Sequence, residues 1–398
     1  MKYIQTNKFI ENAASIRSIC PLEAKDMTAW NLLVFMMKQK TEDFMDKQAL
    51  SMALNLAYGL KASFALHAYG DQMVLDVRFQ WIAQDHLPDS MAVHEIQHCM
   101  DQLMFKAALD EESLQEAKYM LTNKLYRLQE DPDQIAIQTA FSCIEMDHTI
   151  QTKIQGSLEE VDAVTLSQVQ ALYARYLMMD HHVFLCGNVE PELIDYFKTM
   201  DTPILMENQR TLIETQACVY KNIQKEIYQT SLVVAYTTSI DTCSKEFYPL
   251  VLLCSLLGQS PNSLLFEEIR EKQSLCYMIQ SQLIRFDGLL LVLSGIEKKN
   301  VEQVSDLINQ QIERVKTRQV PLEKIDIAKK DWIDALRVSQ DHPFSMIERT
   351  FLDTYLHRDI SLEQQIQQIQ EISYDDLCLV ANKLNKIVQV VVEEGNHE

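Results

Sequence analysis

The chain has 398 residues, of which 47% are hydrophobic and 23% are charged, and its 57 acidic against 36 basic side chains give a net charge of −21. This length exceeds one ordinary core, so two or more compact units are expected, and the few glycines and prolines argue against a loop-rich or disordered protein. The acidity argues against a nucleic-acid partner, because phosphate binding needs a basic surface.

The first 17 residues, MKYIQTNKFIENAASIR, contain neither the apolar segment nor the cleavage site of a signal peptide. No apolar run approaches the roughly 18 residues that a membrane span requires. The nine cysteines are an odd number and form no CxxC pair. They are typical of free thiols in a reducing compartment, so a cytoplasmic location without a membrane span is expected.

The first expected elements are an apolar helix at residues 25–40 (KDMTAWNLLVFMMKQK) and a strand at residues 70–81 (GDQMVLDVRFQW). The strand alternates apolar and polar side chains, as a half-buried antiparallel strand does. A long amphipathic helix is expected at residues 111–130. Its acidic residues Glu111, Glu112 and Glu116 are expected to be surface charge.

Between these elements, residues 94–98 read HEIQH and fit the HExxH pattern, in which two histidines one turn apart bind zinc and a glutamate activates water. The apolar residues around the motif recur every three or four positions and define one face of a helix. His94, Glu95 and His98 fall on or beside the opposite face. Catalytic histidine pairs usually point into the protein, so the motif is interpreted as part of a solvent-exposed helix.

The sequence repeats itself once. Residues 158–190 and 362–395 both show a helix, a break and a short strand in the same order, and residues 130–148 parallel residues 338–357. Two homologous halves are therefore expected, an N-terminal domain at 1–206 and a C-terminal domain at 217–398, joined through the polar stretch 207–216. Each half is predicted to be α+β, with helices packed on a mostly antiparallel sheet.

The most distinctive stretch is SPNSLLFEEIREKQSLCYMIQSQL, residues 260–283. A helix is predicted from about Ser263 to Lys272, followed by a turn and a strand that begins near Cys276. Arg270 then lies at the end of the helix and Tyr277 at the start of the strand, where a cation and a phenol could hold a peptide carbonyl or an oxyanion. The structural alternative is that Arg270 pairs with Glu267 or Glu271 and that Tyr277 is a half-buried packing residue.

This stretch resembles the C-terminal half of the insulinase/pitrilysin family, the inverted-motif zinc peptidases that include the mitochondrial processing peptidases. The family segment S-x-L-F-x-x-(V/I)-R-E-K-x-x-L-x-Y carries an Arg/Tyr pair that helps to bind substrate at the zinc. The matching residues are Ser263, Leu265, Phe266, Ile269, Arg270, Glu271, Lys272, Leu275 and Tyr277. The resemblance implies two α/β halves of about 200 residues each that form half of a clamshell.

Active members of that family carry H-x-x-E-H on an early helix of the first half, and the corresponding helix here is residues 25–40. It contains no histidine and no glutamate, so no zinc site or activated water is expected there. HEIQH has the opposite order and follows some 60 residues later, so it does not replace the lost motif. We therefore expect the chain to have no cofactor of its own and no catalytic residue.

The resemblance implies a zinc-less, non-catalytic subunit of a bacterial metallopeptidase. Such a subunit would pair with a zinc-bearing homologue, or with a second copy of itself, and contribute Arg270 and Tyr277 to peptide binding. One alternative is a peptide-binding or scaffold pseudo-peptidase without hydrolysis. A third possibility is an independent zinc hydrolase that uses His94, Glu95 and His98, and metal content distinguishes it from the other two.

Overall fold

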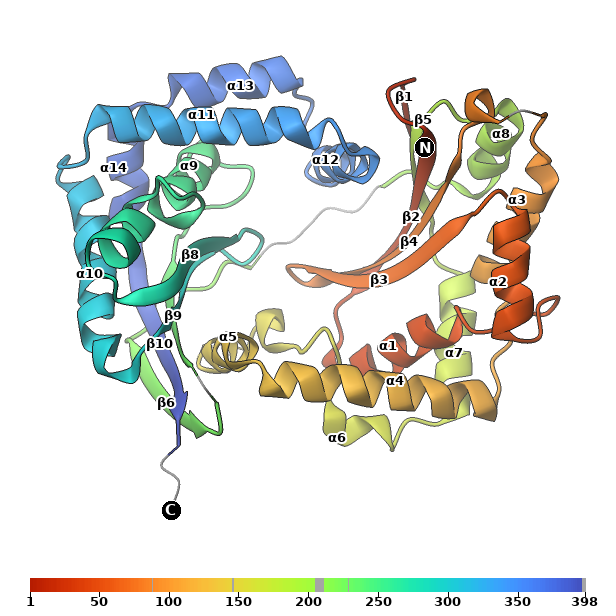
Figure 1. Ribbon diagram of the computed structural model, residues 1–398, viewed down its shortest axis with the longest axis horizontal. Helices are drawn as coiled ribbons and strands as arrows, with labels where there is room; N and C mark the ends of the chain where they lie inside the picture. Colours follow the sequence, from red (N-terminus) through yellow and green to blue (C-terminus); the bar gives the residue numbers. More distant parts are fainter. Residues whose placement is uncertain (88, 145–146, 205–210, 228, 396–398) are drawn as a thin grey trace. The chain divides into compact units, whose positions relative to one another are not determined.

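The computed structural model describes residues 1–87, 89–144, 147–204, 211–227 and 229–395. The chain forms two compact units, each assembled from three segments. Unit 1 contains residues 1–126, 152–208 and 338–359, and unit 2 contains residues 127–151, 209–337 and 360–398. Each unit combines a five-stranded sheet with helices, so the predicted α+β class is confirmed (Figure 1).

Unit 1 is built on a mixed sheet with the strand order β1-β5-β2-β4-β3, in which only β1 and β5 are parallel. Its strands are β1 (Lys2–Gln5), β2 (Glu11–Pro21), β3 (Lys61–Tyr69), β4 (Gln72–Ile82) and β5 (His182–Gly187). Its helices are η1 (Ala24–Asp26), α1 (Met27–Met36), α2 (Lys47–Leu56), η2 (Gln84–His86), α3 (Val93–Phe105), α4 (Glu111–Glu130, which continues into unit 2), α6 (Leu158–Val161), α7 (Leu166–Leu177), α8 (Pro191–Met200) and α12 (Pro343–Tyr355).

Unit 2 repeats this topology with the order β6-β10-β7-β9-β8, and again the first pair is parallel and the others are antiparallel. Its strands are β6 (Val219–Lys225), β7 (Thr230–Thr237), β8 (Cys276–Ile284), β9 (Leu289–Ile296) and β10 (Asn385–Glu394). Its helices are α5 (Pro132–Ser142), η3 (Thr149–Gln151), α9 (Phe247–Gly258), η4 (Phe266–Lys272), η5 (Lys298–Asn300), α10 (Val301–Lys316), α11 (Leu322–Ser339, which continues into unit 1), α13 (Leu362–Glu371) and α14 (Tyr374–Asn382).

The internal repeat of the sequence is visible in matching helix starts. Helices α7 and α14, which precede the last strand of each sheet, both begin with a capping box, formed by Thr165 with Gln168 and by Ser373 with Asp376. In a capping box the two residues satisfy backbone N–H groups that would otherwise lack a partner. The same local chemistry therefore sets the start of both helices.

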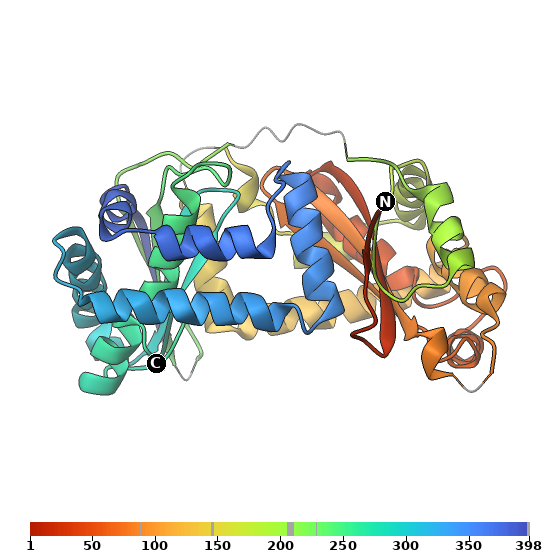
Figure 2. The same cartoon turned by 90° about the horizontal axis from the view of Figure 1, so that it is seen from above.

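Two helices of the repeat pack on the sheet that the other half of the sequence forms. Helix α5 lies in the first half of the chain but packs on β7 and β10, and α12 lies in the second half but packs on β2 and β5. Figure 2 shows α12 beside the strands of unit 1. Both helices begin with a proline, Pro132 or Pro343, which suits the first helical position because its missing N–H needs no partner there. Each sheet thus has one helix supplied by the distant half of the sequence.

The repeat boundaries, 1–206 and 217–398, stay a prediction about the sequence, since the compact units are discontinuous. Within the expected linker 207–216, residues 207–210 lie outside the described residues. All nine cysteines are free thiols. None of the helices within the described residues is both long enough and apolar enough to cross a membrane.

Candidate functional site

The FEEIREK segment forms a π-helix, η4, followed by strand β8, where an α-helix and a strand were predicted. The predicted inward side chains Leu264, Leu265 and Ile269 are buried. The chain makes the wider turn of a π-helix here. This form is rare in proteins, and where it occurs it is often at a functional site. The segment thus has the expected order of elements with a different local geometry.

The Arg270 side chain is exposed and lies over the Phe266 ring, with its guanidinium carbon 4.6 Å from the ring centroid. The neighbouring carboxylates have other partners: Glu267 pairs with Lys272 and Lys324, and Glu268 pairs with Lys272 at 3.2 Å. These lysines lower the pKa values of both glutamates. The structural alternative assumed an ion pair of Arg270 with Glu267 or Glu271, and the contact that the structure gives Arg270 is the Phe266 ring.

Tyr277 follows directly on the first residue of β8, and its side chain is 63% exposed. The pairing register with β9 shifts between Cys276 and Met278, so a bulge lies at Tyr277. Burial raises the pKa of the Cys276 thiol, while a hydrogen bond with Ser294 and the charge of Arg270 lower it. The role of Arg270 and Tyr277 in substrate binding stays a prediction.

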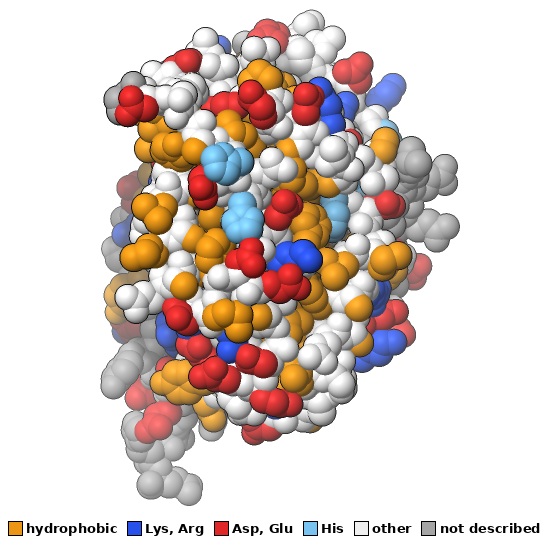
Figure 3. Space-filling view, turned by 90° about the vertical axis from the view of Figure 1, so that its right-hand side faces the viewer, with side chains coloured by type: hydrophobic (Ala, Val, Ile, Leu, Met, Phe, Trp, Pro, Cys, Tyr) orange, Lys and Arg blue, Asp and Glu red, His pale blue; other side chains and the backbone are white. Residues whose placement is uncertain are grey.

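The HEIQH motif lies on α3, and its histidines face solvent as the helical periodicity predicted. The side chains of His94 and His98 are 80% and 45% exposed, whereas Ile96, Cys99 and Met100 are buried. His94 Nε2 lies 3.3 Å from Glu95, and His98 Nε2 lies 3.2 Å from Asp43. Figure 3, which views the end of the molecule that carries α2 and α3, shows histidine side chains at the surface among acidic and apolar ones.

The helix expected to have lost the zinc ligands is α1, and its buried side chains are apolar apart from Thr28 and Asn31. Trp30 and Met27 are 1% exposed, and Leu32, Leu33 and Met36 are fully buried. None of these side chains is a ligand that Zn²⁺ takes in proteins, so α1 does not fit the metal. Within the described residues, no group of three or more His, Cys, Asp and Glu side chains is arranged to hold a metal ion.

The acidic residues at the start of α4 pair with lysines. Glu112 lies 3.0 Å from Lys40, and Glu116 pairs with Lys47. Lys40 also pairs with Asp110 at 2.6 Å, and the pKa of that carboxyl falls to about 2, because hydrogen bonds from Lys40 and Ser113 outweigh its burial. The two glutamates and both lysines line an open pocket of about 360 Å³. Their predicted role as surface charge agrees with these contacts.

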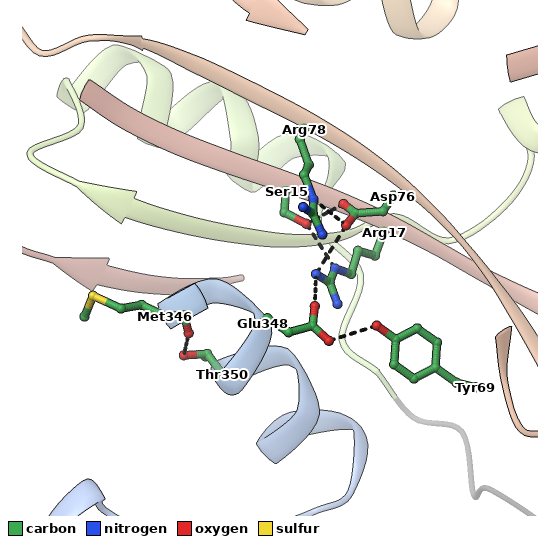
Figure 4. Close-up of polar contacts among 8 residues, drawn as sticks. All are labelled: Ser15, Arg17, Tyr69, Asp76, Arg78, Met346, Glu348 and Thr350. Atoms are coloured by element: carbon green, nitrogen blue, oxygen red, sulfur yellow. Dashed lines mark hydrogen bonds and ion pairs between the residues drawn. The ribbon is translucent and has the colours of Figure 1, made fainter. Parts of the chain in front are cut away.

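A buried charge network on the sheet of unit 1 was not predicted from the sequence. Arg17 on β2 is 1% exposed, and its register partner on β4 is the fully buried Asp76. Arg17 Nη2 lies 3.3 Å from Asp76, which also accepts a hydrogen bond of 2.7 Å from Arg78 Nε and one of 2.6 Å from Ser15 Oγ (Figure 4). One carboxylate thus binds two guanidinium groups on one face of the sheet.

Helix α12 completes this network. Glu348 accepts a hydrogen bond of 2.6 Å from Arg17 Nη2 and one of 2.9 Å from the hydroxyl of Tyr69 on β3 (Figure 4). The Arg17 guanidinium carbon also lies 4.0 Å from the centre of the Phe351 ring. Burial lowers the pKa of Arg17, but Asp76 and Glu348 together raise it above its ordinary value. The guanidinium is therefore a permanent cation between a sheet and a helix.

Part of this network could have been predicted from the sequence. Asp76 and Arg78 are two residues apart and are the only polar residues between Met73 and Phe79, so they share one face of the strand. A carboxylate and a guanidinium at such positions indicate a buried pair. Arg17 lies 59 residues before Asp76 in the sequence, and Glu348 lies 331 residues after Arg17. Only the fold brings these residues together.

Comparison with known proteins gives consistent matches over the chain. A family model described as the peptidase M16 inactive domain matches residues 163–331. A Bacillus subtilis (strain 168) protein named probable inactive metalloprotease YmfF is 23% identical over 396 residues, covering 96% of this chain and 92% of that protein.

Solved structures share the fold. A conserved protein from Enterococcus faecalis V583 matches with a TM-score of 0.90 at 21% identity and covers 100% of this chain and 96% of that chain. A peptidase M16 inactive domain from Pseudomonas fluorescens matches with a TM-score of 0.80 at 16% identity, over 100% of this chain and 96% of that chain. At these identities the structural matches establish the two-sheet architecture.

Proposed function

We propose that the chain is a member of the inactive type of the M16 peptidases, the insulinase/pitrilysin family, and that it is the zinc-less subunit of a two-subunit metallopeptidase. In this proposal a zinc-bearing homologue supplies the H-x-x-E-H motif and cleaves peptides. This chain binds the substrate through Arg270 and Tyr277 and hydrolyses nothing by itself. A cytoplasmic location is part of the same proposal.

The single observation that carries the proposal is the contrast between two elements. Helix α1, where the family resemblance expects zinc ligands, buries no His, Cys, Asp or Glu side chain, and its buried residues are apolar apart from Thr28 and Asn31. The Arg/Tyr segment keeps its family residues, and both side chains are accessible to solvent. Loss of the metal-binding half of an active site with retention of the substrate-binding half favours a subunit that works beside a catalytic partner.

The chemistry of the retained pair suits a peptide. An exposed guanidinium donates several hydrogen bonds in a fixed fork, and a phenol donates one more, so together they can hold a peptide carbonyl or the oxyanion formed during hydrolysis. The Phe266 ring beneath Arg270 restrains the guanidinium by a cation–π contact. A restrained donor loses less side-chain entropy when it binds a substrate.

The test is peptide cleavage by a mixture of this chain and a purified homologue that carries H-x-x-E-H. Arg270→Ala is expected to lower kcat/KM about 10- to 100-fold, the usual effect of removing one charged contact to a transition state, and Tyr277→Phe to lower it less. Arg337→Ala is the matched control, because Arg337 is also an exposed arginine of unit 2 and pairs with Asp334.

Two results would overturn the proposal. If Arg270→Ala and Arg337→Ala mixtures cleave equally well, Arg270 does not bind substrate. If no mixture cleaves any peptide while the chain alone binds peptides, the chain is a scaffold or binding protein.

A further inference from the structure

Helix α2 has apolar side chains on two opposite faces. Leu50 is buried and Leu54 is half-buried, and together they form the inward face. Met52 and Leu56 lie one turn apart on the outward face and are 60% and 75% exposed. A surface helix normally has polar residues on its outward face, because one apolar face is enough to attach it to a core. The second apolar face of α2 therefore needs another explanation.

The outward face of α2 begins at the open pocket beside the start of α4. Gln48 lines the pocket and lies one turn before Met52, so the pocket and the apolar pair form one strip that follows the helix for about 12 Å, at 1.5 Å for each residue. Met45, which is 65% exposed, adds apolar surface at the pocket itself. Figure 3 shows apolar side chains among acidic ones on the side of unit 1 that carries α2. We call the pocket with Met45, Met52 and Leu56 the α2 strip.

The pocket end of the α2 strip carries an excess of negative charge. Three carboxylates and two ammonium groups line the pocket and give a formal charge of −1, namely Asp46, Glu112 and Glu116 with Lys40 and Lys47. Asp110 binds Lys40 at 2.6 Å and brings the charge to −2. The Glu112 side chain lies 3.0 Å from Lys40 and is still 89% exposed, so it can take a second cationic partner. The pocket therefore attracts cations and repels anions.

An exposed apolar pair beside a negatively charged pocket restricts the kind of partner. Methionine side chains adapt to different partner shapes, and amphipathic helices dock through apolar side chains one turn apart. Lysine or arginine side chains beside those apolar residues would complement the pocket. A second copy of this chain is disfavoured, because each copy has a net charge of −21. A membrane with anionic lipids is disfavoured because its surface would face the carboxylates of the pocket.

We propose that the α2 strip docks a cationic amphipathic helix of another protein. The apolar side chains of that helix cover Met52 and Leu56, and a lysine or arginine one or two turns away reaches Glu112 in the pocket. The proposal rests on the exposure of α2 and on the charge of the pocket. It does not depend on substrate binding by Arg270 and Tyr277, so it holds or fails independently of the proposed function.

Binding of a synthetic helical peptide to the full chain tests the proposal. The probe is fluorescein-labelled LKKLLKLLKKLLKL, whose leucines form one helical face and whose lysines form the other. The reference peptide LEELLELLEELLEL has the same apolar face with acidic residues opposite. Fluorescence anisotropy is read at about 0.15 M salt, where exposed charges more than about 8 Å apart are largely screened. The lysine peptide is expected to bind saturably and at least about 10-fold more tightly than the glutamate peptide.

A double variant locates the binding site on α2. Met52→Ser with Leu56→Ser removes the exposed apolar pair and is expected to weaken binding of the lysine peptide at least about 10-fold, because the apolar surface that the peptide covers is lost. Both side chains are exposed, so the variant is expected to fold like the wild type. The matched control is Met178→Ser with Leu379→Ser, which changes the same residue types at exposed positions outside the α2 strip and should leave binding unchanged.

A second variant tests the charge of the pocket. Glu112→Gln removes one negative charge, while Lys40 keeps its contact with Asp110. Binding of the lysine peptide is expected to weaken about 3- to 10-fold and to depend less on the salt concentration. Glu297→Gln is the control, because Glu297 is also an exposed glutamate that pairs with a lysine, Lys299, and it should have no effect.

Four results would overturn the proposal. The first is no binding of the lysine peptide, or equal binding of the two peptides. The second is equal binding of the lysine peptide to the Met52→Ser with Leu56→Ser variant and to its control. The third is self-association of the chain, measured by sedimentation, that this variant loses, because the strip would then bind a second copy. The fourth is co-sedimentation with phosphatidylglycerol vesicles that the same variant loses, because the strip would then bind a membrane.

Discussion

The direction in which a side chain points decides what HEIQH can do. One helical turn separates His94 from His98, the spacing that binds zinc in active peptidases, but both rings face solvent and each lies beside a different carboxylate. A catalytic zinc site needs enclosed ligands that are held in place by further hydrogen bonds. The same spacing on the buried face of α1 would have had that enclosure.

The purified chain is therefore expected to contain zinc well below one equivalent, and His94→Ala or His98→Ala should leave that content unchanged. Elemental analysis after dialysis against a weak chelator measures it. Stoichiometric zinc that disappears in His94→Ala would instead support an independent zinc hydrolase.

His181 makes the stability of unit 1 depend on pH. Burial, with a smaller contribution from the charge of His182, lowers the pKa of His181 to about 4, and its Nδ1 shares a hydrogen bond of 2.7 Å with Ser18 Oγ. Between pH 6.5 and 4 the unfolded chain binds a proton here that the folded chain does not. Stability is thus complete above pH 6.5 and falls by about 3 kcal/mol as the pH drops to 4.

Urea unfolding of wild type and His181→Gln at pH 7.5 and pH 4.5 isolates this contribution. The variant, which has no titrating ring, should lose less stability on acidification than the wild type. An equal loss in both proteins would show that other groups cause the acid sensitivity.

For single residues, the sequence predicts which face of an element a side chain lies on better than it predicts which other side chains it contacts. The three- and four-residue recurrence of apolar side chains in α3 correctly placed His94 and His98 on the solvent face. The Arg17–Asp76–Glu348 network was missed because strand pairing and the packing of α12 join residues that are far apart in sequence. Periodicity reports which face is buried, but it does not report which polar side chains meet there.

At the scale of elements, α1 is a packing helix. The helix contributes Trp30 and Leu33 to the core of unit 1, and its neighbours include α7. Apolar side chains at these positions stabilise the fold in proportion to the surface that they remove from water.

Trp30→Ala is accordingly expected to destabilise the protein by about 3–5 kcal/mol, the range for removing a large buried aromatic side chain. Tyr119→Ala on α4 is the control, because Tyr119 is 71% exposed, and it should change the free energy of unfolding by less than about 0.5 kcal/mol. Urea denaturation of both variants measures the difference. A similar small effect in both would mean that α1 is not part of the core.

The order of elements was predictable, but some of their geometry was not. The helix and strand around Arg270 and Tyr277 appear where the pattern of Leu264, Leu265 and Ile269 placed them. The π-helical turns did not follow from that pattern, because the same inward residues suit an α-helix equally well. The use of α5 and α12 on the distant sheets was also missed, since the repeat gives the order of elements and not the sheet on which each one packs.

At the scale of the whole molecule, the internal repeat gives two sheets of the same topology, and the two units differ in the side chains that they carry. Unit 1 has the apolar α1 and the Arg17 network, and unit 2 has the exposed Arg270 and Tyr277. If Arg270 and Tyr277 bind substrate as proposed, a chain without metal ligands on α1 needs a partner to take part in hydrolysis. The proposed function is therefore tested by peptide hydrolysis in a mixture of this chain with a zinc-bearing homologue.

The most direct measurement is the rate of peptide hydrolysis as this chain is titrated into a fixed amount of a zinc-bearing homologue with the H-x-x-E-H motif. We expect no hydrolysis by this chain alone and a rate that rises until it saturates at one equivalent. Hydrolysis by this chain alone, or a rate in the mixture that does not depend on its addition, would contradict the account.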